Sequence, residues 1–390
     1  MAAALGVLVS CGSVKSGEEV VAASRDSKVV VAYVTSWSEV MPDPQYMTHI
    51  NYAFGHVNES FNGVKIDNEE RLRQIVDLRK QKPELKVLLS IGGWGSGRFS
   101  EMAANDEYRR AFAADCDRVV KEFALDGIDI DWEYPTSSMA NISSSPDDTE
   151  NFTLLMQDIR AAIGNEKELT LATVASARYI DFKAILPSVD FVNIMAYDMA
   201  SAPKHHSALY PSGHSGDITS DGAVTAHLKA GVPPSKLVMG MPFYGRGGDG
   251  YPSFQDYNKV GNTDTQYTEK WDEVAQVPYL ADKNDTLVFG FENPRSLAIK
   301  CQYILDKDLL GGMYWDYSGD NEQGDLRRTV AENLLGKPHK AKVLVLTERG
   351  GQHGGFTDAG LRWLAAEGAK GNFSITEINN ARNKIGRAHV

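Results

Sequence analysis

The sequence predicts an α/β protein whose main part is a closed (β/α)8 barrel, and three observations support this. First, eight short apolar segments rich in β-branched residues recur between residues 28 and 337. Second, amphipathic stretches with helical periodicity separate these segments. Third, the apolar segments are nearly continuous, which indicates a parallel sheet covered on both faces. A region of this length without the fingerprint glycines of an open sheet favours closure into a barrel.

The eight strands follow one another in order along the chain. They are expected at residues 29–34, 49–54, 86–91, 126–133, 169–174, 191–195, 237–242 and 312–315. The clearest helical stretches are residues 69–82, 107–124, 149–163 and 295–308. Residues 247–291, between the seventh and eighth strands, are long for a loop and carry many aromatic residues. We therefore expect a short insertion there, too small to wall a deep tunnel.

The fourth strand carries the most informative residues of the chain, within the segment DGIDIDWEYP at residues 126–135. Side chains alternate between the faces of a strand, so Asp129, Asp131 and Glu133 share one face. Three acids in a row repel one another and resist burial, so folding stability alone would not select them. A solvated acidic edge strand is the alternative. The β-branched and aromatic residues between the acids favour a buried strand with a chemical role instead.

Together with Asp126, these acids match the DxxDxDxE signature, and the chain resembles the family 18 glycoside hydrolases, the chitinase family. The resemblance covers residues 28–337 and implies the same barrel, with the active site at the carboxyl ends of the strands. It implies that Glu133 is the general acid that protonates the glycosidic oxygen. That role requires a carboxyl group kept protonated near neutral pH by burial and by neighbouring carboxylates.

The resemblance also implies a substrate-assisted mechanism, in which the 2-acetamido oxygen of the sugar attacks the anomeric carbon and water later opens the intermediate with retention. Asp131 would orient the acetamido group and stabilise the developing positive charge. Asp129 would form a coupled pair with Asp131 by sharing a proton. Asp126 is out of phase with the inward row, and we interpret it as a structural residue at the entrance of the strand.

The sixth strand ends in Met195-Ala-Tyr197-Asp198, which matches the MxYD motif of the family. There the tyrosine hydroxyl would bond the acetamido carbonyl, and the aspartate would help to hold a distorted sugar ring. Met195 would form an apolar floor, although core packing explains it equally well. Trp315, at the end of the eighth strand, would lie beneath the sugar that bears the cleaved bond. Trp94 would flank the cleavage point on the other side.

Four further residues match lining positions of the family less specifically. Sugars bind against flat apolar faces with polar groups at their edges. Tyr33, Phe54 and Tyr244 lie at or near strand ends, but core aromatic residues would explain them almost as well. Arg246 is expected either to contact the glycan or to pair with an acid.

Charge and composition exclude several other classes of protein. The net charge of −12 and the lack of a basic cluster argue against nucleic-acid binding. The three cysteines are too few and too scattered for a disulfide framework or a zinc site. His205 and His206 have no third ligand at a useful spacing, so we expect neither a metal nor a cofactor. The expected partner is a glycan that contains N-acetylglucosamine, bound by a monomer.

The first 27 residues are predicted to be a leader and a tether. An apolar run over residues 2–10 ends at Cys11, and Leu8-Val-Ser-Cys11 resembles a bacterial lipobox, in which the cysteine is lipidated. The run is too short to span a bilayer. We expect an exported bacterial protein, either a periplasmic or cell-surface lipoprotein anchored through Cys11 or a secreted one. A frayed, unprocessed tail is the alternative.

Residues 338–390 are predicted to be a fragment of a second domain. A strand over 342–347, a helical pattern over 357–367 and a strand over 373–378 indicate a β-α-β unit. This unit resembles the opening of trehalose-utilisation-type domains, which have a glutamine-amidotransferase-like fold. It is too short to build that sheet. Residues 385–390 resemble a translated sequencing adapter, so neither His353 nor His389 is interpreted as functional.

Three functions are compatible with these residues. The first is hydrolysis of β-1,4 N-acetylglucosamine linkages in chitin or chitooligosaccharides. The second is an endo-β-N-acetylglucosaminidase that acts on N-glycans. The third is a chitinase-like lectin that binds glycan without turnover, and the intact Glu133 argues against it because binding does not need this acid.

Overall fold

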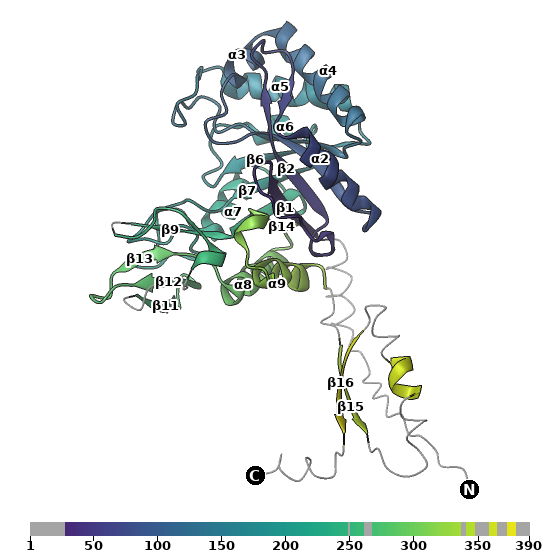
Figure 1. The fold of residues 1–390 in the computed structure, drawn as a ribbon. Helices are drawn as coiled ribbons and strands as arrows, with labels where there is room; N and C mark the ends of the chain where they lie inside the picture. The colour runs from purple at the N-terminus through teal and green to yellow at the C-terminus, as the bar shows by residue number, and fades with distance from the viewer. Residues whose placement is uncertain are drawn as a thin grey trace. The chain divides into compact units, whose positions relative to one another are not determined.

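The structure is a computed structural model that describes residues 28–248, 250–260, 267–336, 341–347, 359–364 and 373–379. Two compact units meet at the bond between Gly336 and Lys337. Figure 1 shows the fold of each unit. Three sets of residues discussed above lie outside the described residues: the predicted leader with Cys11, the histidines His353 and His389, and residues 385–390.

Eight parallel strands within the described residues form the barrel of the first unit. They are β1 (Val29–Thr35), β2 (His49–Val57), β4 (Lys86–Gly92), β5 (Gly127–Asp131), β6 (Glu168–Val174), β7 (Phe191–Met195), β8 (Leu237–Pro242) and β14 (Gly311–Trp315). Their order is β1-β14-β8-β7-β6-β5-β4-β2, and β1 also pairs with β2. This last pairing closes the ring and confirms the predicted barrel. A short strand, β3 (Val64–Ile66), pairs with β2 in the antiparallel direction.

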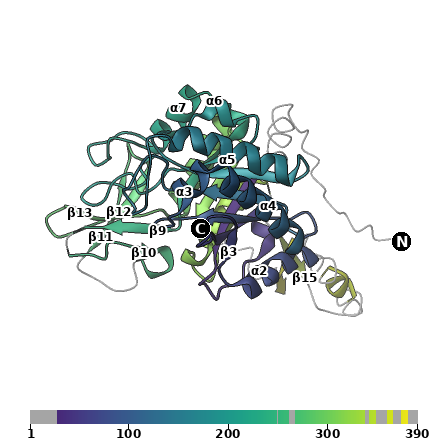
Figure 2. The same ribbon diagram turned by 90° about the horizontal axis from the view of Figure 1, so that it is seen from above.

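Helices surround the barrel, as the view from above shows (Figure 2). They are α2 (Glu69–Val76), α3 (Phe99–Ala104), α4 (Asp106–Glu122), α5 (Asp148–Ile163), α6 (Phe182–Ile185), α7 (Ser220–Lys229), α8 (Pro294–Asp306) and α9 (Asp325–Leu334). Single 3-10 turns are η1 (Pro44–Tyr46), η2 (Asp77–Lys80), η3 (Pro234–Lys236), η4 (Tyr257–Lys259) and η5 (Tyr317–Gly319). The stretch predicted as one helix over 69–82 is therefore an α-helix that tightens into a 3-10 turn.

Capping side chains fix where helices begin: Asn105 accepts two backbone N–H bonds ahead of α4, and Asn293 forms a capping box ahead of α8.

The two faces of β5 show how the barrel separates apolar from polar residues. Ile128 and Ile130 point outward and belong to the large core cluster that the helices cover. Asp129 and Asp131 point inward and are buried. The neighbouring strand approaches β5 very closely at Gly92, whose φ is +132° and where a Cβ atom would lie 1.9 Å from the Asp131 carbonyl oxygen. Only glycine fits this position.

The insertion between β8 and β14 is an antiparallel sheet. Its strands are β9 (Tyr244–Gly247), β10 (Gln255–Asp256), β11 (Thr268–Asp272), β12 (Val277–Ala281) and β13 (Leu287–Gly290), in the order β10-β9-β13-β12-β11. The predicted insertion is thus present, and it begins a few residues before position 247. It extends to one side of the barrel in Figure 1.

The second unit contains a parallel pair of strands, β15 (Ala341–Thr347) and β16 (Phe373–Asn379), and a short helix over 359–364. This arrangement agrees with the predicted β-α-β unit. In the described part of the chain, no helix has both the length and the apolar character needed to cross a membrane.

Candidate active site

A cavity of about 780 Å³ opens at the carboxyl ends of the barrel strands. Most residues that the sequence suggests for catalysis or substrate binding line it. They are Tyr33, Phe54, Trp94, Asp131, Glu133, Met195, Tyr197, Asp198, Tyr244, Arg246 and Trp315. These residues come from strands that are far apart in the sequence, and barrel closure brings them to one mouth.

Asp126 lies away from the cavity, at the start of β5. Its Oδ2 atom accepts a 2.7 Å hydrogen bond from the backbone N–H of Val87 and forms an ion pair with Arg79. These contacts tie the entrance of β5 to β4 and to the end of η2. The position suits a structural role.

Asp129 lies in the barrel interior, where both of its carboxylate oxygens are occupied. Tyr33 Oη and Ser90 Oγ each donate to Oδ2 at 2.8 Å. Thr170 Oγ1 donates to Oδ1 at 2.6 Å, and Asn193 Nδ2 lies 3.3 Å from the same oxygen. Burial raises the pKa of Asp129, while these four donors favour the charged form and oppose the rise.

The predicted sharing of a proton between Asp129 and Asp131 stays a prediction. Four donors bind the carboxylate of Asp129, and no hydrogen bond between the two carboxyl groups is found among the described residues. Asp131 is 4% exposed, and its Oδ1 has no hydrogen-bond partner among the described residues. Burial, then the charge of Glu133, then that of Asp129 raise the pKa of Asp131 well above its usual range. The charge of Glu133 therefore raises the pKa of Asp131 more than the charge of Asp129 does.

Glu133 has the titration behaviour that a general acid requires. Burial raises its pKa to about 7, a hydrogen bond from Tyr134 opposes the rise, and the charge of Asp198 adds to it. A substantial fraction of Glu133 is therefore protonated at neutral pH. The carboxyl group also lines the cavity, where it is open to a substrate.

Asp198 is held as a carboxylate by an arginine fork. Arg246 donates from Nε to Oδ1 and from Nη2 to Oδ2, both at 2.6 Å. His206 Nδ1 lies 3.5 Å from Oδ1. Burial alone would raise the pKa of Asp198, but Arg246 and His206 hold it well below its usual range. Arg246 was expected either to contact the glycan or to pair with an acid, and in the structure it pairs with Asp198.

The rings in the cavity form a continuous apolar wall. Trp315 stacks on Phe54 with centroids 5.5 Å apart and an interplanar angle of 21°. Tyr33 lies 5.6 Å from Trp315, and its hydroxyl group bonds Asp129 behind the wall. Phe54, Tyr33 and Tyr244 also belong to the apolar cluster inside the barrel. These three residues therefore both pack in the barrel core and line the cavity.

Tyr197 and Trp94 occupy opposite environments. The Tyr197 hydroxyl contacts Met313 Sδ at 3.8 Å, and burial raises the pKa of this tyrosine well above its usual value. Trp94 is 62% exposed at the rim, 6.5 Å and edge-on from Tyr134. Exposed rings of this kind offer a face to a ligand.

Sequence reasoning missed several residues that line the cavity. These are Trp37, Tyr134, Met139 and Phe254. Trp37 lies two residues beyond β1, so its position after a strand end could have indicated it. Phe254 stacks on Tyr244 with centroids 4.7 Å apart, but no motif surrounds it in the sequence. Met139 is exposed in a loop whose course no sequence pattern predicts.

The two neighbouring histidines contact different parts of the molecule: His205 contacts the insertion, and His206 contacts the active site. His205 Nε2 lies 3.2 Å from Asp272 Oδ2 on β11, whereas His206 faces Asp198. Among the residues that the structure describes, no group of three or more His, Cys, Asp or Glu side chains is arranged to hold a metal ion.

Comparisons with known proteins agree with this geometry. Residues 29–320 match the model of glycosyl hydrolases family 18. Chitinase A1 of Niallia circulans is 30% identical, over 77% of this chain and 58% of the relative. Chitotriosidase-1 of Mus musculus is 31% identical, over 76% of this chain and 74% of the relative. The solved structure of a family 18 N-acetylglucosaminidase from Paenibacillus barengoltzii is 32% identical, with a TM-score of 0.73 over 79% of this chain and all of that one. The chain belongs to family 18 of the glycosyl hydrolases.

Proposed function

We propose that the chain hydrolyses β-1,4 linkages between N-acetylglucosamine units in chitin or chitooligosaccharides, with retention at the anomeric carbon. One observation carries the proposal: Glu133, whose pKa is about 7, lines the same cavity as Asp131, which has a carboxyl oxygen without a hydrogen-bond partner among the described residues. An acid held partly protonated and a buried hydrogen-bond acceptor are the two groups that acetamido-assisted hydrolysis requires. The names of the chitinases in the comparison support the choice of substrate.

In the first step, Glu133 donates its proton to the glycosidic oxygen as the bond between that oxygen and the anomeric carbon breaks. The acetamido oxygen of the same sugar forms the new bond to that carbon. Asp131 accepts the acetamido N–H at Oδ1, which bonds no group in the part of the chain that the structure describes. The Tyr197 hydroxyl donates to the acetamido oxygen, and Trp315 provides the face beneath the sugar.

In the second step, Glu133 is a carboxylate and acts as a base. It takes a proton from water, whose oxygen attacks the anomeric carbon from the face that the leaving group vacated. The bond to the acetamido oxygen breaks, and the product keeps the original configuration. Asp198 and Arg246 form a charged pair at the wall and hold the polar edge of the sugar site.

The mode of action separates two candidates within the family. Similarity to the Paenibacillus barengoltzii N-acetylglucosaminidase favours release of single sugars as the second candidate. Incubation with chitohexaose followed by mass spectrometry distinguishes them, because an endo-acting chitinase yields internal fragments and an N-acetylglucosaminidase yields monosaccharide from the start.

Substrate class is tested by comparing a fluorogenic chitobioside with a high-mannose glycoprotein. We expect turnover of the chitobioside and no release of N-glycans. Activity on the glycoprotein alone would contradict the proposal and favour an endo-β-N-acetylglucosaminidase. Chitin binding without any turnover would favour a lectin.

We propose that the chain is exported and anchored through a lipid on Cys11. The lipobox-like segment Leu8-Val-Ser-Cys11 supports this. Expression in a bacterium fed radiolabelled palmitate tests it: the parent should be labelled and Cys11→Ser should not. Equal labelling of both would contradict the proposal.

A further inference from the structure

His206 lies behind the wall of the catalytic cavity. Its side chain is 1% exposed, and it is not among the described residues that line the cavity. Its Nδ1 atom lies 3.5 Å from Oδ1 of Asp198, the same oxygen that Arg246 Nε binds. Its ring packs against that of Tyr244, with centroids 5.3 Å apart. His206 therefore contacts the active site through residues that line the cavity.

Folding stability alone does not favour a histidine at this position. Neither ring nitrogen of His206 has a hydrogen-bond partner with good geometry among the described residues. Burial of a polar group without a partner lowers stability, and an apolar side chain of similar size would avoid this loss. At 3.5 Å, Nδ1 is just too far for a normal hydrogen bond to Asp198, but such contacts at active sites often shorten when a substrate binds. The position of the ring thus suits a role in catalysis better than one in packing.

The segment that carries His206 is fixed by hydrogen bonds on both sides. The carbonyl oxygen of His206 accepts a 3.0 Å bond from the backbone N–H of Met199, in the loop just beyond β7. The next residue, Ser207, donates from Oγ to Glu292 Oε1 at 2.6 Å. The carbonyl oxygen of Ser207 accepts a bond from Lys300 Nζ on α8. The backbone around His206 is therefore held in place before a substrate binds.

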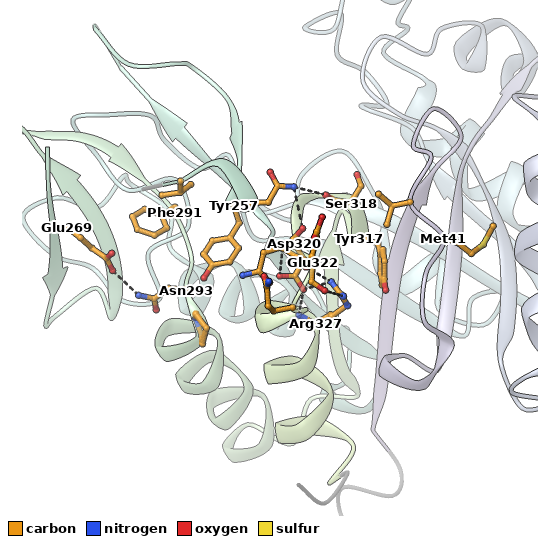
Figure 3. Close-up of a pocket in the computed structure, with 16 residues that line it drawn as sticks. Met41, Tyr257, Glu269, Phe291, Asn293, Tyr317, Ser318, Asp320, Glu322 and Arg327 are labelled. Atoms are coloured by element: carbon orange, nitrogen blue, oxygen red, sulfur yellow. Dashed lines mark hydrogen bonds and ion pairs between the residues drawn. The ribbon is translucent and has the colours of Figure 1, made fainter. Parts of the chain in front are cut away.

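Glu292 and Lys300 form an ion pair in which both side chains are fully buried. The two neighbours of Glu292, Phe291 and Asn293, lie at the wall of a second cavity of about 960 Å³ (Figure 3). Glu292 itself is not among the described residues that line that cavity, and it bonds Ser207 instead. Because loss of one partner would leave an uncompensated buried charge, this pair is a firm anchor for the segment that follows the histidine.

Arg246 and Asp198 are much less constrained than His206. Their side chains are 31% and 41% exposed. Arginine has a long side chain with several rotatable bonds, so the fork and its carboxylate can move together. His206 carries a short, rigid ring on an anchored segment and faces the same carboxylate. Burial raises the pKa of Asp198, and Arg246 and then His206 lower it, so both residues favour its charged form.

We propose that His206 is a positioning residue that fixes the carboxylate of Asp198 for catalysis. The inference rests on the proposed function, because Asp198 is expected to hold the sugar ring in the distorted shape that precedes cleavage. An interaction that matters mainly for the distorted sugar stabilises the transition state more than the bound substrate. The contribution of His206 should therefore appear in kcat, with little change in KM.

The test compares three replacements of His206 in the full chain by steady-state kinetics on a fluorogenic chitobioside. His206→Asn places an amide N–H where Nδ1 stands, so it can still donate to Asp198. His206→Gln places the amide where Nε2 stands, and His206→Leu removes the donor. His227→Leu is the matched control, because His227 is a buried histidine whose Nε2 also bonds no described group, and it lines neither cavity.

We expect kcat of His206→Leu and His206→Gln to fall by about 5- to 30-fold, with KM within about 2-fold of the parent. His206→Asn should keep most of the parental kcat, and the His227 control should keep all of it. Urea unfolding of His206→Leu should show a fold at least as stable as the parent, because the variant removes a buried polar group without a partner.

Three results would overturn the inference and leave the proposed function intact. The first is a parental kcat in folded His206→Leu, and the second is an equal loss in all three variants. The third is a rise in KM at unchanged kcat, or a kcat that falls in step with the free energy of unfolding. If His206→Leu fails to fold, the comparison of His206→Asn with His206→Gln decides, since both are polar. Absence of turnover in the parent would overturn both the inference and the proposed function.

Discussion

The guanidinium group of Arg246 binds both carboxylate oxygens of Asp198, at 2.6 Å each, across 48 positions of the chain. Asp198 follows β7, the sixth barrel strand, and Arg246 lies on β9 of the insertion. The pair therefore links the insertion to the barrel at the edge of the catalytic cavity. It also fixes the charge of Asp198, which in turn raises the pKa of Glu133.

Replacement of Arg246 should reduce catalysis even when the positive charge is kept. A lysine cannot form the two parallel hydrogen bonds of the guanidinium fork. For Arg246→Lys we expect kcat/KM on a chitobioside to fall by roughly 10- to 100-fold. Arg110→Ala, at an exposed site on α4, is the control and should retain full activity. Parental kcat/KM in Arg246→Lys would show that the fork has no part in catalysis.

The pH dependence of kcat/KM should report the ionisation of Glu133. Because Glu133 must carry its proton to act as an acid, kcat/KM should decline as the pH rises through about 7. Asp198→Asn removes a charge that raises the pKa of Glu133, so the basic limb of the profile should move to lower pH. A basic limb that does not move would contradict the assignment of this limb to Glu133.

Glu133 should also reduce the stability of the fold above neutral pH. Its ordinary pKa is 4.5 and its pKa in the folded protein is about 7. Below pH 4.5 both states hold the proton, so nothing is lost. As the pH rises from 4.5 to 7, the unfolded state releases this proton and gains a well-hydrated charge, while the folded state still holds the proton, so the folded state loses stability relative to the unfolded one. Above about pH 7 both states are ionised and the loss levels off. Since the side chain is partly open to the cavity, we expect Glu133→Gln to be more stable than the parent by about 1–2 kcal/mol at pH 8.

This gain should disappear at pH 4, and urea unfolding at the two pH values measures it. A variant with the same advantage at both pH values would show that packing, and not the charge, is responsible.

Two threonines on β6 offer a matched pair for the interior network. Thr170 donates to Asp129, whereas Thr173 Oγ1 is buried and has no hydrogen-bond partner among the described residues. Thr170→Val should destabilise the protein by about 1–3 kcal/mol, because it leaves a buried carboxylate short of a donor. Thr173→Val removes a hydroxyl that bonds nothing in the described structure, so it should be neutral or stabilising. Equal losses from both would mean that the Asp129 network contributes no specific stability.

Much of the barrel was predictable because its strands carry local signals. A continuous run of β-branched residues identifies β1, and alternation of acids with Ile128 and Ile130 identifies the two faces of β5. Helix limits were less predictable, since α2 tightens into a 3-10 turn where the pattern shows no break. The antiparallel strands of the insertion are short, and pairing with distant partners determines where they begin and end.

The candidate site was predictable where residues lie at strand ends, and unpredictable where they depend on loops. Asp131 was predictable as the last residue of β5, and Glu133 as a residue just beyond the end of that strand. The donors to Asp129 come from four different strands, so only the folded barrel shows that they converge on its two carboxylate oxygens. The ring of Phe254 and the thioether of Met139 lie in loops, whose paths no periodic pattern determines.

The most direct test of the account is kcat/KM for a fluorogenic chitobioside in Glu133→Gln. Loss of the general acid should lower it by at least ~10²- to 10⁴-fold, while calorimetry shows that affinity for chitooligosaccharides is kept. Glu107→Gln, at an exposed site at the start of α4, is the matched control and should behave as the parent. Activity of Glu133→Gln within a few-fold of the parent would contradict the assignment of Glu133 as the acid and the mechanism built on it.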